Sequence, residues 1–251
     1  MSRLRCLAGA CGVALMAACG GDGMSTGGGA STARLRYVHA VADTGALDVR
    51  VRGVLRTSLT AVSFGVATDY ESVTSGVLSV SSQPAPSTSA DVPRSIANLG
   101  TIVVSEGASV TLVAIGEARD TVSGRAAGIS AYLDDVTKPV SGQSRVRLIN
   151  ASPDAGAVDV YATLTGSARS MVPTFGGVDY RSAVTRTLSP GSYAVKITPL
   201  SDTTVTLATA TATLADGGAQ TIVIRGYAGA LPAGVPAARR LAITSMVNVA
   251  P

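Results

Sequence analysis

The side chains that could do chemistry in this chain are few, and most of them recur. His39 is the single histidine among 251 residues, so any mechanism with a histidine base would have to centre on it. Asp43 and Asp48 lie five residues apart, and Asp154 and Asp159 repeat that spacing. Two carboxylates with nearby carbonyl oxygens could bind a hard cation such as calcium, which takes about six to eight oxygen ligands. The same carboxylates could also serve carboxylate-only catalysis, as in glycoside hydrolysis.

A structural interpretation of these residues is simpler, and we adopt it. Asn150 stands at the position that matches His39 in the repeat described below, and asparagine can bond to a turn as histidine does. We expect His39 to be a polar residue at a strand end, hydrogen-bonded to the following turn. Aspartates cap turns by accepting backbone N–H bonds, and the acidic spacing is not that of an EF-hand. The sequence therefore predicts no catalytic residue, no metal site and no cofactor.

Asp134-Asp135 is a weaker candidate for a site, because the second copy of the repeat shows no comparable acidic pair. The aromatic residues also argue against a stacking platform for sugars, since the chain has no Trp, seven Tyr and two Phe. Phe64 and Phe175 occupy matched positions, as do Tyr70 and Tyr180, so we interpret them as core or corner residues.

Cys19 is another residue whose surroundings in the sequence indicate a specific chemistry. Arg3 and Arg5 precede a short apolar stretch at residues 7–17, and small residues follow. This is the pattern of a signal peptide, and it is too short for a membrane-spanning helix. The string Leu15-Met16-Ala17-Ala18-Cys19 resembles the lipobox of bacterial lipoproteins, with Met16 where that pattern usually has Leu. The resemblance implies cleavage before Cys19 and lipidation of its thiol. The alternative is an ordinary secretory signal in which Cys19 is incidental.

These features define the predicted ends and address of the protein. Residues 1–18 form the signal peptide, and residues 19–33 form the lipidated cysteine and a flexible Gly/Ser linker. Cys6 and Cys11 lie in the removed peptide, so the mature chain holds a single thiol and no internal disulfide. We expect an exported protein, lipid-anchored in the bacterial cell envelope. Gly20 follows the modified cysteine where an inner-membrane retention signal would have Asp, which favours the outer membrane.

The chain repeats itself at an offset of about 110 residues. Residues 34–40 correspond to 145–151, and residues 43–49 correspond to 154–160; Phe64-Gly65 likewise matches Phe175-Gly176. So many matches at one offset indicate a duplication. We therefore predict two domains, at residues 34–140 and 145–251, which touch because the joint at residues 138–144 is short.

Both copies read as strands. The chain is 46% hydrophobic and 14% charged, and residues 34–40 and 145–151 alternate polar and apolar side chains, as half-buried strands do. Further strands are predicted at 49–54, 66–73, 77–81, 96–104, 109–115, 128–133, 158–164, 180–188, 192–198, 204–214, 220–225 and 238–246, with an inserted loop at 81–94. About seven short strands per copy predict an all-β protein of two tandem Ig-like antiparallel β-sandwich domains.

The opening string of each copy resembles a known family. In the second copy it runs Arg147-Leu148-Ile149-Asn150-Ala151-Ser152-Pro153-Asp154-Ala155-Gly156-Ala157-Val158-Asp159-Val160-Tyr161. This string is similar to the first motif of the domain-of-unknown-function family 4397 (DUF4397). The resemblance covers nearly all of residues 34–247 and implies an exported bacterial protein in which the domain often occurs in tandem; it implies no known activity. The first copy departs from the motif at Val41-Ala42, and the second departs at Asn150.

Charge and composition narrow the function classes. Loss of Arg3 and Arg5 would reduce the formal net charge from +4 to about +2, and the basic residues are scattered, which argues against nucleic acid as a partner. We expect a membrane-anchored cell-envelope lipoprotein that acts as a non-catalytic binding or structural module. Its expected partners are the membrane, through the lipid anchor, and a protein or glycan of the envelope. The alternative is an envelope enzyme, or an accessory subunit of one, that uses carboxylate chemistry.

Replacement of Cys19 by Ala should abolish acyl labelling, because the predicted lipid attaches through a cysteine thiol and Cys19 is the only cysteine of the predicted mature chain. Metabolic labelling with an alkyne fatty acid, followed by membrane fractionation, measures this. We expect an uncleaved or soluble product. Membrane retention equal to that of the native chain would contradict the lipid anchor.

Overall fold

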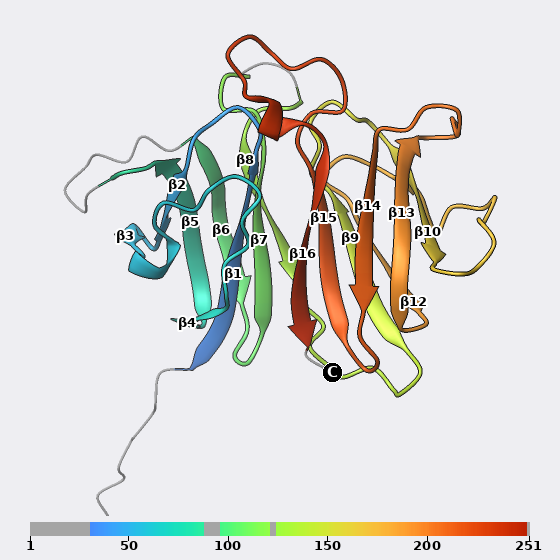
Figure 1. Cartoon of the computed structure of the whole chain (residues 1–251). Coiled ribbons are helices and arrows are strands. Elements are labelled where there is room, and N and C mark those ends of the chain that lie inside the picture. Colours follow the sequence, from blue (N-terminus) through green and yellow to red (C-terminus); the bar gives the residue numbers. More distant parts are fainter. Residues whose placement is uncertain (1–30, 88–95, 121–123, 250–251) are drawn as a thin grey trace, which may run out of the picture.

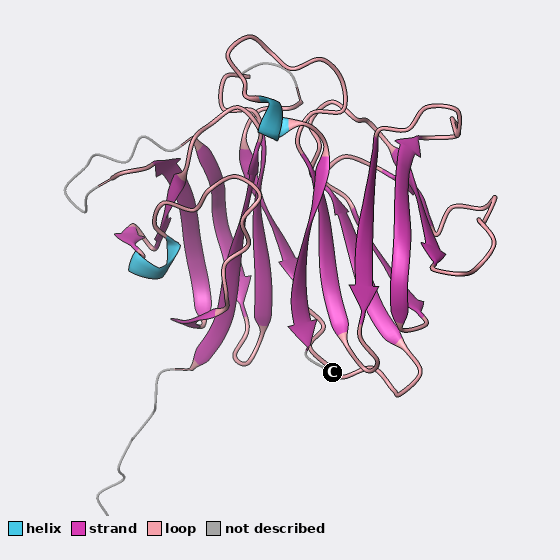
Figure 2. Cartoon of the chain, viewed as in Figure 1, coloured by secondary structure: helices cyan, strands magenta, loops and turns pink. Residues whose placement is uncertain are grey.

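The computed structural model describes residues 31–87, 96–120 and 124–249. The predicted signal peptide and Cys19 lie outside these residues. The chain is all-β, with 54% strand and 3% helix, which confirms the predicted class (Figure 2). The two helical segments, η1 (Thr57–Leu59) and η2 (Ala237–Arg239), are single 3₁₀ turns. Within the described ranges, no helix has the length and hydropathy needed to span a bilayer.

The strands of the described residues fall into two sets of eight. The first set comprises β1 (Thr32–Val41), β2 (Leu47–Val51), β3 (Val54–Leu55), β4 (Glu71–Thr74), β5 (Gly76–Pro84), β6 (Ala97–Val104), β7 (Ser109–Gly116) and β8 (Gly128–Leu133). The second comprises β9 (Ser144–Asn150), β10 (Val158–Leu164), β11 (Phe175–Val178), β12 (Ala183–Leu188), β13 (Gly191–Pro199), β14 (Ala208–Leu214), β15 (Ala219–Arg225) and β16 (Ala242–Val249).

Each set forms two four-stranded sheets with the same strand order. The first half has sheets β4-β1-β7-β8 and β3-β2-β5-β6, and the second has β12-β9-β15-β16 and β11-β10-β13-β14. Pairs β1/β7 and β9/β15 are parallel, and all other pairs of the named strands are antiparallel. The halves stand side by side in Figure 1. Adding eight to each strand number of the first half reproduces the second, as a duplicated sequence should.

The apolar positions of the alternating strands fill the space between the two sheets of each half. In the first half, Leu35 and Tyr37 of β1 pack with Val49 of β2 and Leu112 of β7 in one core cluster. In the second, Leu148, Val160 and Ile222 come from the matching strands and belong to a separate cluster. Burial of such side chains contributes about 1.5–3 kcal/mol each, so each half has its own source of stability.

Several observed strands differ from the predicted ones: among them, β12 begins at Ala183 rather than at residue 180, β14 begins at Ala208 rather than at residue 204, and three further cases have an identifiable cause. Residues 66–70 do not belong to β4 but form an extended strap, which we define as residues 65–70, held to β1 by a bridge at Ala67. β11 was missed because its Phe-Gly-Gly-Val string has no alternation to detect. β16 begins at Ala242 because Pro236 opens a 3₁₀ turn where the strand was expected to begin.

A third apolar cluster joins the halves. Sheet β4-β1-β7-β8 turns its outer face toward sheet β12-β9-β15-β16, and the cluster draws residues from both. It comprises Val38, Ala40, Val113, Ile115, Ile149, Ala151, Val223 and Met246. All but Met246 are fully buried. Because both faces of β1, β7, β9 and β15 are covered, polar side chains on these strands, such as Arg36 and Asn150, are also buried.

We expect residues 33–140 and 145–251 to fold separately, because every strand pairing lies within one half and each half has its own core. Each fragment should melt cooperatively in differential scanning calorimetry, at a lower temperature than the full chain because separation exposes the shared apolar cluster. If either fragment shows no cooperative transition while the full chain does, then the halves are not independent domains.

Candidate functional site at the junction of the two halves

His39 and Asn150 do the same structural work at the ends of β1 and β9. The Gly45 carbonyl lies 2.7 Å from Nε2 of His39, and the Val41 N–H lies 3.2 Å from Nδ1. Since a carbonyl can only accept and an N–H can only donate, the proton is on Nε2. Nδ2 of Asn150 likewise donates to the Gly156 carbonyl (2.8 Å), and its Oδ1 accepts from Ser152 (3.1 Å). The prediction that His39 bonds to the following turn is confirmed.

His39 is fully buried, and this burial lowers its pKa from 6.5 to about 4. The bond to Gly45 opposes the shift, while the positive charges of Arg239 and Arg225 add to it. The imidazole is therefore neutral at physiological pH. Both ring nitrogens are engaged in hydrogen bonds to the backbone, so neither is free to act as a general base.

The repeated aspartates hold the backbone of distant loops. Asp43 Oδ1 and Oδ2 accept the N–H groups of Ala118 (2.6 Å) and Arg119 (2.9 Å). In the same way, Asp154 accepts those of Ala228 (2.8 Å) and Gly229 (2.9 Å). Each bond joins the turn after the first strand of a half to the loop after its seventh strand. Both oxygens of both carboxylates are occupied by amide donors.

The second pair of aspartates lies deeper. Asp48 accepts bonds from Ala61 and Ser87, each at 2.6 Å, and is 2% exposed. Asp159 accepts bonds from Gly177 (2.8 Å) and Ser201 (2.9 Å). Ala61 and Ser201 have positive φ angles of 51° and 59°, a conformation that costs a non-glycine residue about 1–3 kcal/mol and persists where other bonds hold it.

The sequence correctly predicted backbone-bonding aspartates but not the range of the bonds. Expected to hold adjacent turns, they instead connect loops that are far apart along the chain. Asp43 and Asp48 do not face one another across a cleft; each one faces its own loop amides. Among the described residues, no three His, Cys, Asp or Glu side chains are grouped closely enough to hold a metal ion.

Asp134, which the sequence ranked below the repeated aspartates, is the hub of the junction. Its carboxylate receives hydrogen bonds from Thr111 (2.7 and 2.8 Å) and from the hydroxyl of Tyr70 (2.7 Å), and it forms an ion pair with Arg147 of the second half. The side chain of Asp134 is fully buried. A buried carboxylate of this kind must be fully paired to be tolerated.

Arg36 and Arg147, at matched positions of β1 and β9, hook the end of the opposite half in the same way. Nε of Arg36 donates to Thr111 (2.9 Å), Nη1 to the Val247 carbonyl (2.9 Å) and Nη2 to Asn248 (2.8 Å). Arg36 is 2% exposed, and burial lowers its pKa.

For Arg147, Nε donates to Thr221 (3.2 Å), Nη1 to the Leu133 carbonyl (2.9 Å) and Nη2 to Asp134. Asn248 thus takes the place in the second half that Asp134 has in the first. The second copy has no acidic pair at this place, as the sequence indicates, but an amide fills the position that matches Asp134.

One end of the junction is closed by a phenylalanine between two arginines. The guanidinium carbons of Arg225 and Arg239 lie 4.8 and 4.1 Å from the centroid of the Phe64 ring. A Cβ at Gly65, where φ is +80°, would collide with the side chain of Arg225. Phe64 is therefore a junction residue, and only its match Phe175 is in a core, so the core interpretation was wrong for Phe64.

A second contact across the junction joins Glu117 and Tyr227, which occupy matched positions. The Tyr227 hydroxyl donates to the Glu117 carboxylate at 2.6 Å. Burial and this carboxylate both raise the pKa of Tyr227, so its hydroxyl stays protonated and continues to donate.

The junction also forms a groove. It lies between the strap and β16, has a volume of about 460 Å³, and is lined by Arg36, Gly65, Ala67, Thr68, Asp69, Tyr70, Thr244, Ser245, Met246 and Val247. We call it the junction groove. A hollow of about 470 Å³ on the other side of the strap shares Asp69 and Tyr70 with it. Both volumes are within the range of about 300–1,000 Å³ typical of ligand sites.

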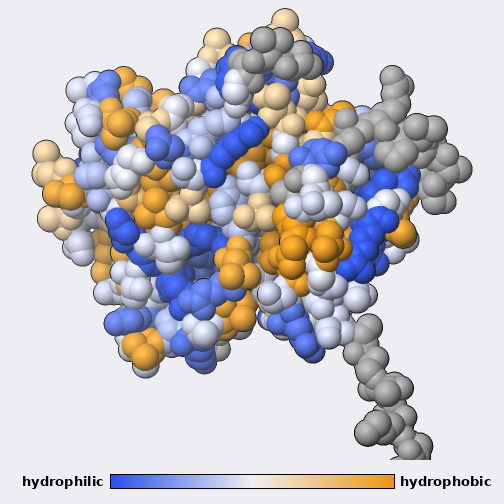
Figure 3. All heavy atoms as spheres, turned by 180° about the vertical axis from the view of Figure 1, so that it is seen from behind, coloured by the Kyte–Doolittle hydropathy of each residue, from blue (hydrophilic) through white to orange (hydrophobic). Residues whose placement is uncertain are grey.

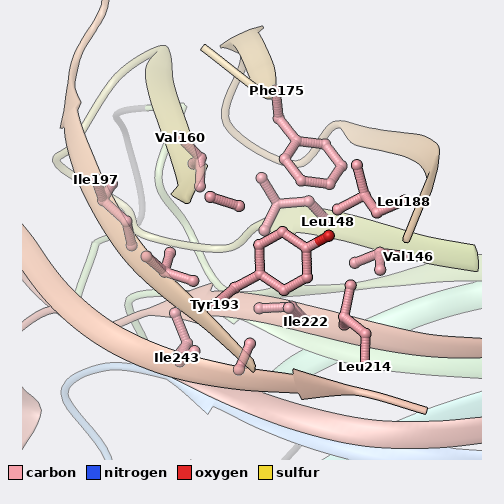
Figure 4. A pocket seen from close by; sticks show the side chains of 13 residues that line it. Val146, Leu148, Val160, Phe175, Leu188, Tyr193, Ile197, Leu214, Ile222 and Ile243 are labelled. Carbon is pink, nitrogen blue, oxygen red and sulfur yellow. The ribbon is translucent and has the colours of Figure 1, made fainter. Parts of the chain in front are cut away.

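The other hollows of the described residues are less suited to a ligand. A cavity of about 20 Å³ lies in the core of the second half, enclosed by apolar side chains and the ring of Tyr193 (Figure 4). It has room for about one water molecule. The surface seen from behind mixes hydrophilic and hydrophobic residues, with one compact hydrophobic group near the middle of the view (Figure 3).

Replacement of His39 by Asn should remove a pH dependence of stability. Between pH 6.5 and 4 the unfolded state binds a proton that the folded state refuses, so the native chain loses up to about 3 kcal/mol of unfolding free energy as the pH falls through that window. The asparagine can make the bonds that Asn150 makes. At pH 8 it should cost about 1 kcal/mol, through the lost edge contact with Phe64. Urea melts at several pH values measure this. Equal pH dependence of the two chains would contradict it.

Comparison with solved structures gives only distant likenesses. The Bacillus anthracis TIE protein is 12% identical over 78% of this chain and 34% of its own, with a TM-score of 0.27. This chain therefore spans about a third of that protein's length. A Parabacteroides distasonis protein and a Bacteroides ovatus protein, both described as cell adhesion proteins, are each 11% identical. They cover 86% and 85% of this chain and 98% and 95% of their own, with TM-scores of 0.23 and 0.22. Scores this low assign neither fold nor function.

No curated protein matches the chain. The profile of one family does, over residues 33–161, a range that contains the strands of the first half except for Thr32 of β1, together with β9 and the beginning of β10. The chain therefore belongs to the family of the domain of unknown function DUF4397.

Proposed function

We infer that this protein is an exported lipoprotein of the bacterial cell envelope that acts as a non-catalytic binding or structural module. The observation that carries this proposal is the junction itself. Two sandwiches are fastened face to face by a buried apolar cluster and two arginine hooks, beside a polar groove of ligand size. Packed sandwiches suit a binding role because a stiff scaffold holds loops and grooves in a fixed arrangement.

The use made of the chemically capable side chains supports a scaffold over an enzyme. His39 and the four repeated aspartates each bond two backbone groups, and those bonds hold the loops at the ends of the sandwiches. A residue committed in this way contributes to folding, and its use in catalysis would require the loop to open. The predicted tether at Cys19 precedes β1 by 12 residues, which would leave the sandwiches close to the membrane.

A binding assay with residues 20–251, which include every described residue, tests this function. The immobilised chain should bind solubilised envelope proteins or purified cell-wall glycan of the producing bacterium saturably, and mass spectrometry should show that the bound component is chemically unchanged. A hydrolysed product that disappears in the Asp43→Asn/Asp48→Asn variant, with its fold verified by circular dichroism, would contradict the proposal and favour the carboxylate enzyme.

A further inference from the structure

The strand at the open side of the junction groove carries unpaired backbone groups. β16 pairs only with β15. The carbonyls of Gly218 and Ile224 accept bonds from Arg145 and Ala151, on the β9 side. In a strand, successive residues direct their backbone groups to opposite neighbours. The even-numbered residues of β15 therefore point to β9, and the odd-numbered residues point to β16.

This alternation fixes the direction of the groups on β16. Val223 of β15 lies opposite Thr244, so Thr244 bonds to β15, while Ile243, Ser245 and Val247 direct their N–H and C=O groups to the open edge. The bond from Arg36 to the Val247 carbonyl agrees with this assignment. Within the described residues, the backbone groups of Ile243 and Ser245 have no hydrogen-bond partner at that edge.

β16 lacks most of the features that usually protect an edge strand, and its one register irregularity, between Val247 and Val249, is confined to its end. Its sequence, Ala-Ile-Thr-Ser-Met-Val-Asn-Val, contains no charged residue, proline or glycine over eight residues. Edge strands of soluble proteins are normally blunted by charge, proline, bulges or a covering segment, because an open ladder recruits another strand. The strap approaches β16 in Figure 1, but the groove separates the two.

The matching strand β8 makes a side-chain contact across the junction that β16 lacks. There the hydroxyl of Tyr132 donates to the Arg181 carbonyl at 2.9 Å, and the Arg181 guanidinium donates to the Ala126 carbonyl. Met246 occupies the place of Tyr132 in the second half and has no hydroxyl. β16 instead contacts the first half through the bond from Thr244 to the Gly65 carbonyl (2.8 Å) and through the bonds from Arg36 to the Val247 carbonyl and Asn248.

The strap contributes a charge to the groove. Asp69 is exposed, and within the described residues its carboxylate makes no hydrogen bond or ion pair. We propose that the junction groove binds an extended peptide segment of a partner protein, which adds a strand to the open edge of β16 and places a lysine or arginine against Asp69. This inference rests on the proposed binding function and names its site and ligand class.

Peptide selection on the chain of residues 20–251 tests the inference. A display library of random dodecapeptides is panned on the chain, and affinities of the selected peptides are measured by fluorescence anisotropy. We expect binders rich in β-branched residues with a Lys or Arg, and their binding should slow hydrogen exchange of the Ile243 and Ser245 amides. Three outcomes would overturn the proposal. They are selected peptides that protect other amides, cell-wall glycans that bind in place of the peptides when offered in competition, and an absence of peptide binders.

Three variants make the test specific. Ser245→Pro removes an N–H that β15 does not use, so the fold should survive, and peptide affinity should fall at least about tenfold. Ser245→Ala keeps the N–H and should bind within about twofold of the native chain. Ala131→Pro, at the matched edge position of β8, is the control and should also bind normally. Equal affinity of the Ser245→Pro and Ser245→Ala variants would overturn the proposal.

Asp69→Asn should lower the affinity for peptides that contain Lys or Arg by about threefold to tenfold. It should not change the affinity for peptides in which Ser replaces that Lys or Arg. Should Ser245→Pro fail to fold, this variant and the exchange measurement still decide. If the native chain dimerises and Ser245→Pro abolishes the dimer, the edge of β16 pairs with a second copy of the chain, and the proposal of a peptide ligand is overturned. If an envelope component binds the native chain and Ser245→Pro equally, the binding function stands and the edge-pairing inference fails.

Discussion

Two arginines, the buried Arg36 and the partly buried Arg147, set the condition that the rest of the junction must meet. A guanidinium removed from water costs several kcal/mol unless its donors are all satisfied, and Arg36 and Arg147 are satisfied only when the halves are docked. Each uses the threonine of the neighbouring strand in its own half and the last strand of the other. The pairing is therefore specific for one relative position, which the apolar cluster alone would not define.

The two hooks are alike in geometry but differ in charge. The carboxylate of Asp134 pairs with both guanidiniums, that of Arg147 and, at 4.0 Å, that of Arg36. Asn248 supplies only a neutral amide oxygen, which accepts a bond from Arg36. The ring of Tyr70, 4.6 Å from the Arg36 guanidinium, compensates in part by a cation–π contact. Burial and the bond to Asp134 raise the pKa of Tyr70 to about 12, so it remains a donor to that carboxylate.

Divergence between the copies has occurred where the copies meet. The core positions keep their character, as with Leu35 and Val146. Phe175 lies in the core of its half, whereas its match Phe64 lies at the junction, against Arg225 and Arg239. Tyr132 of β8 bonds to the Arg181 carbonyl across the junction, whereas its match Met246 on β16 has no hydroxyl and lies beside the groove. The facing sheets of the two halves are subject to different packing constraints. Each sheet must fit the surface of the other half and not a copy of its own surface.

The sequence by itself determined the all-β class, the repeat, the first and seventh strands of each half, and the structural roles of His39 and the aspartates. These follow from local rules: alternation of side chains, turn residues, and the equivalence of His39 and Asn150 as paired donor and acceptor. The tertiary structure alone decided the parallel pairing of β1 with β7, the hub role of Asp134 and the open edge of β16. Each of these depends on contacts between different strands or loops, some between residues as much as 212 positions apart, and no local pattern encodes which of two buried faces meets the other.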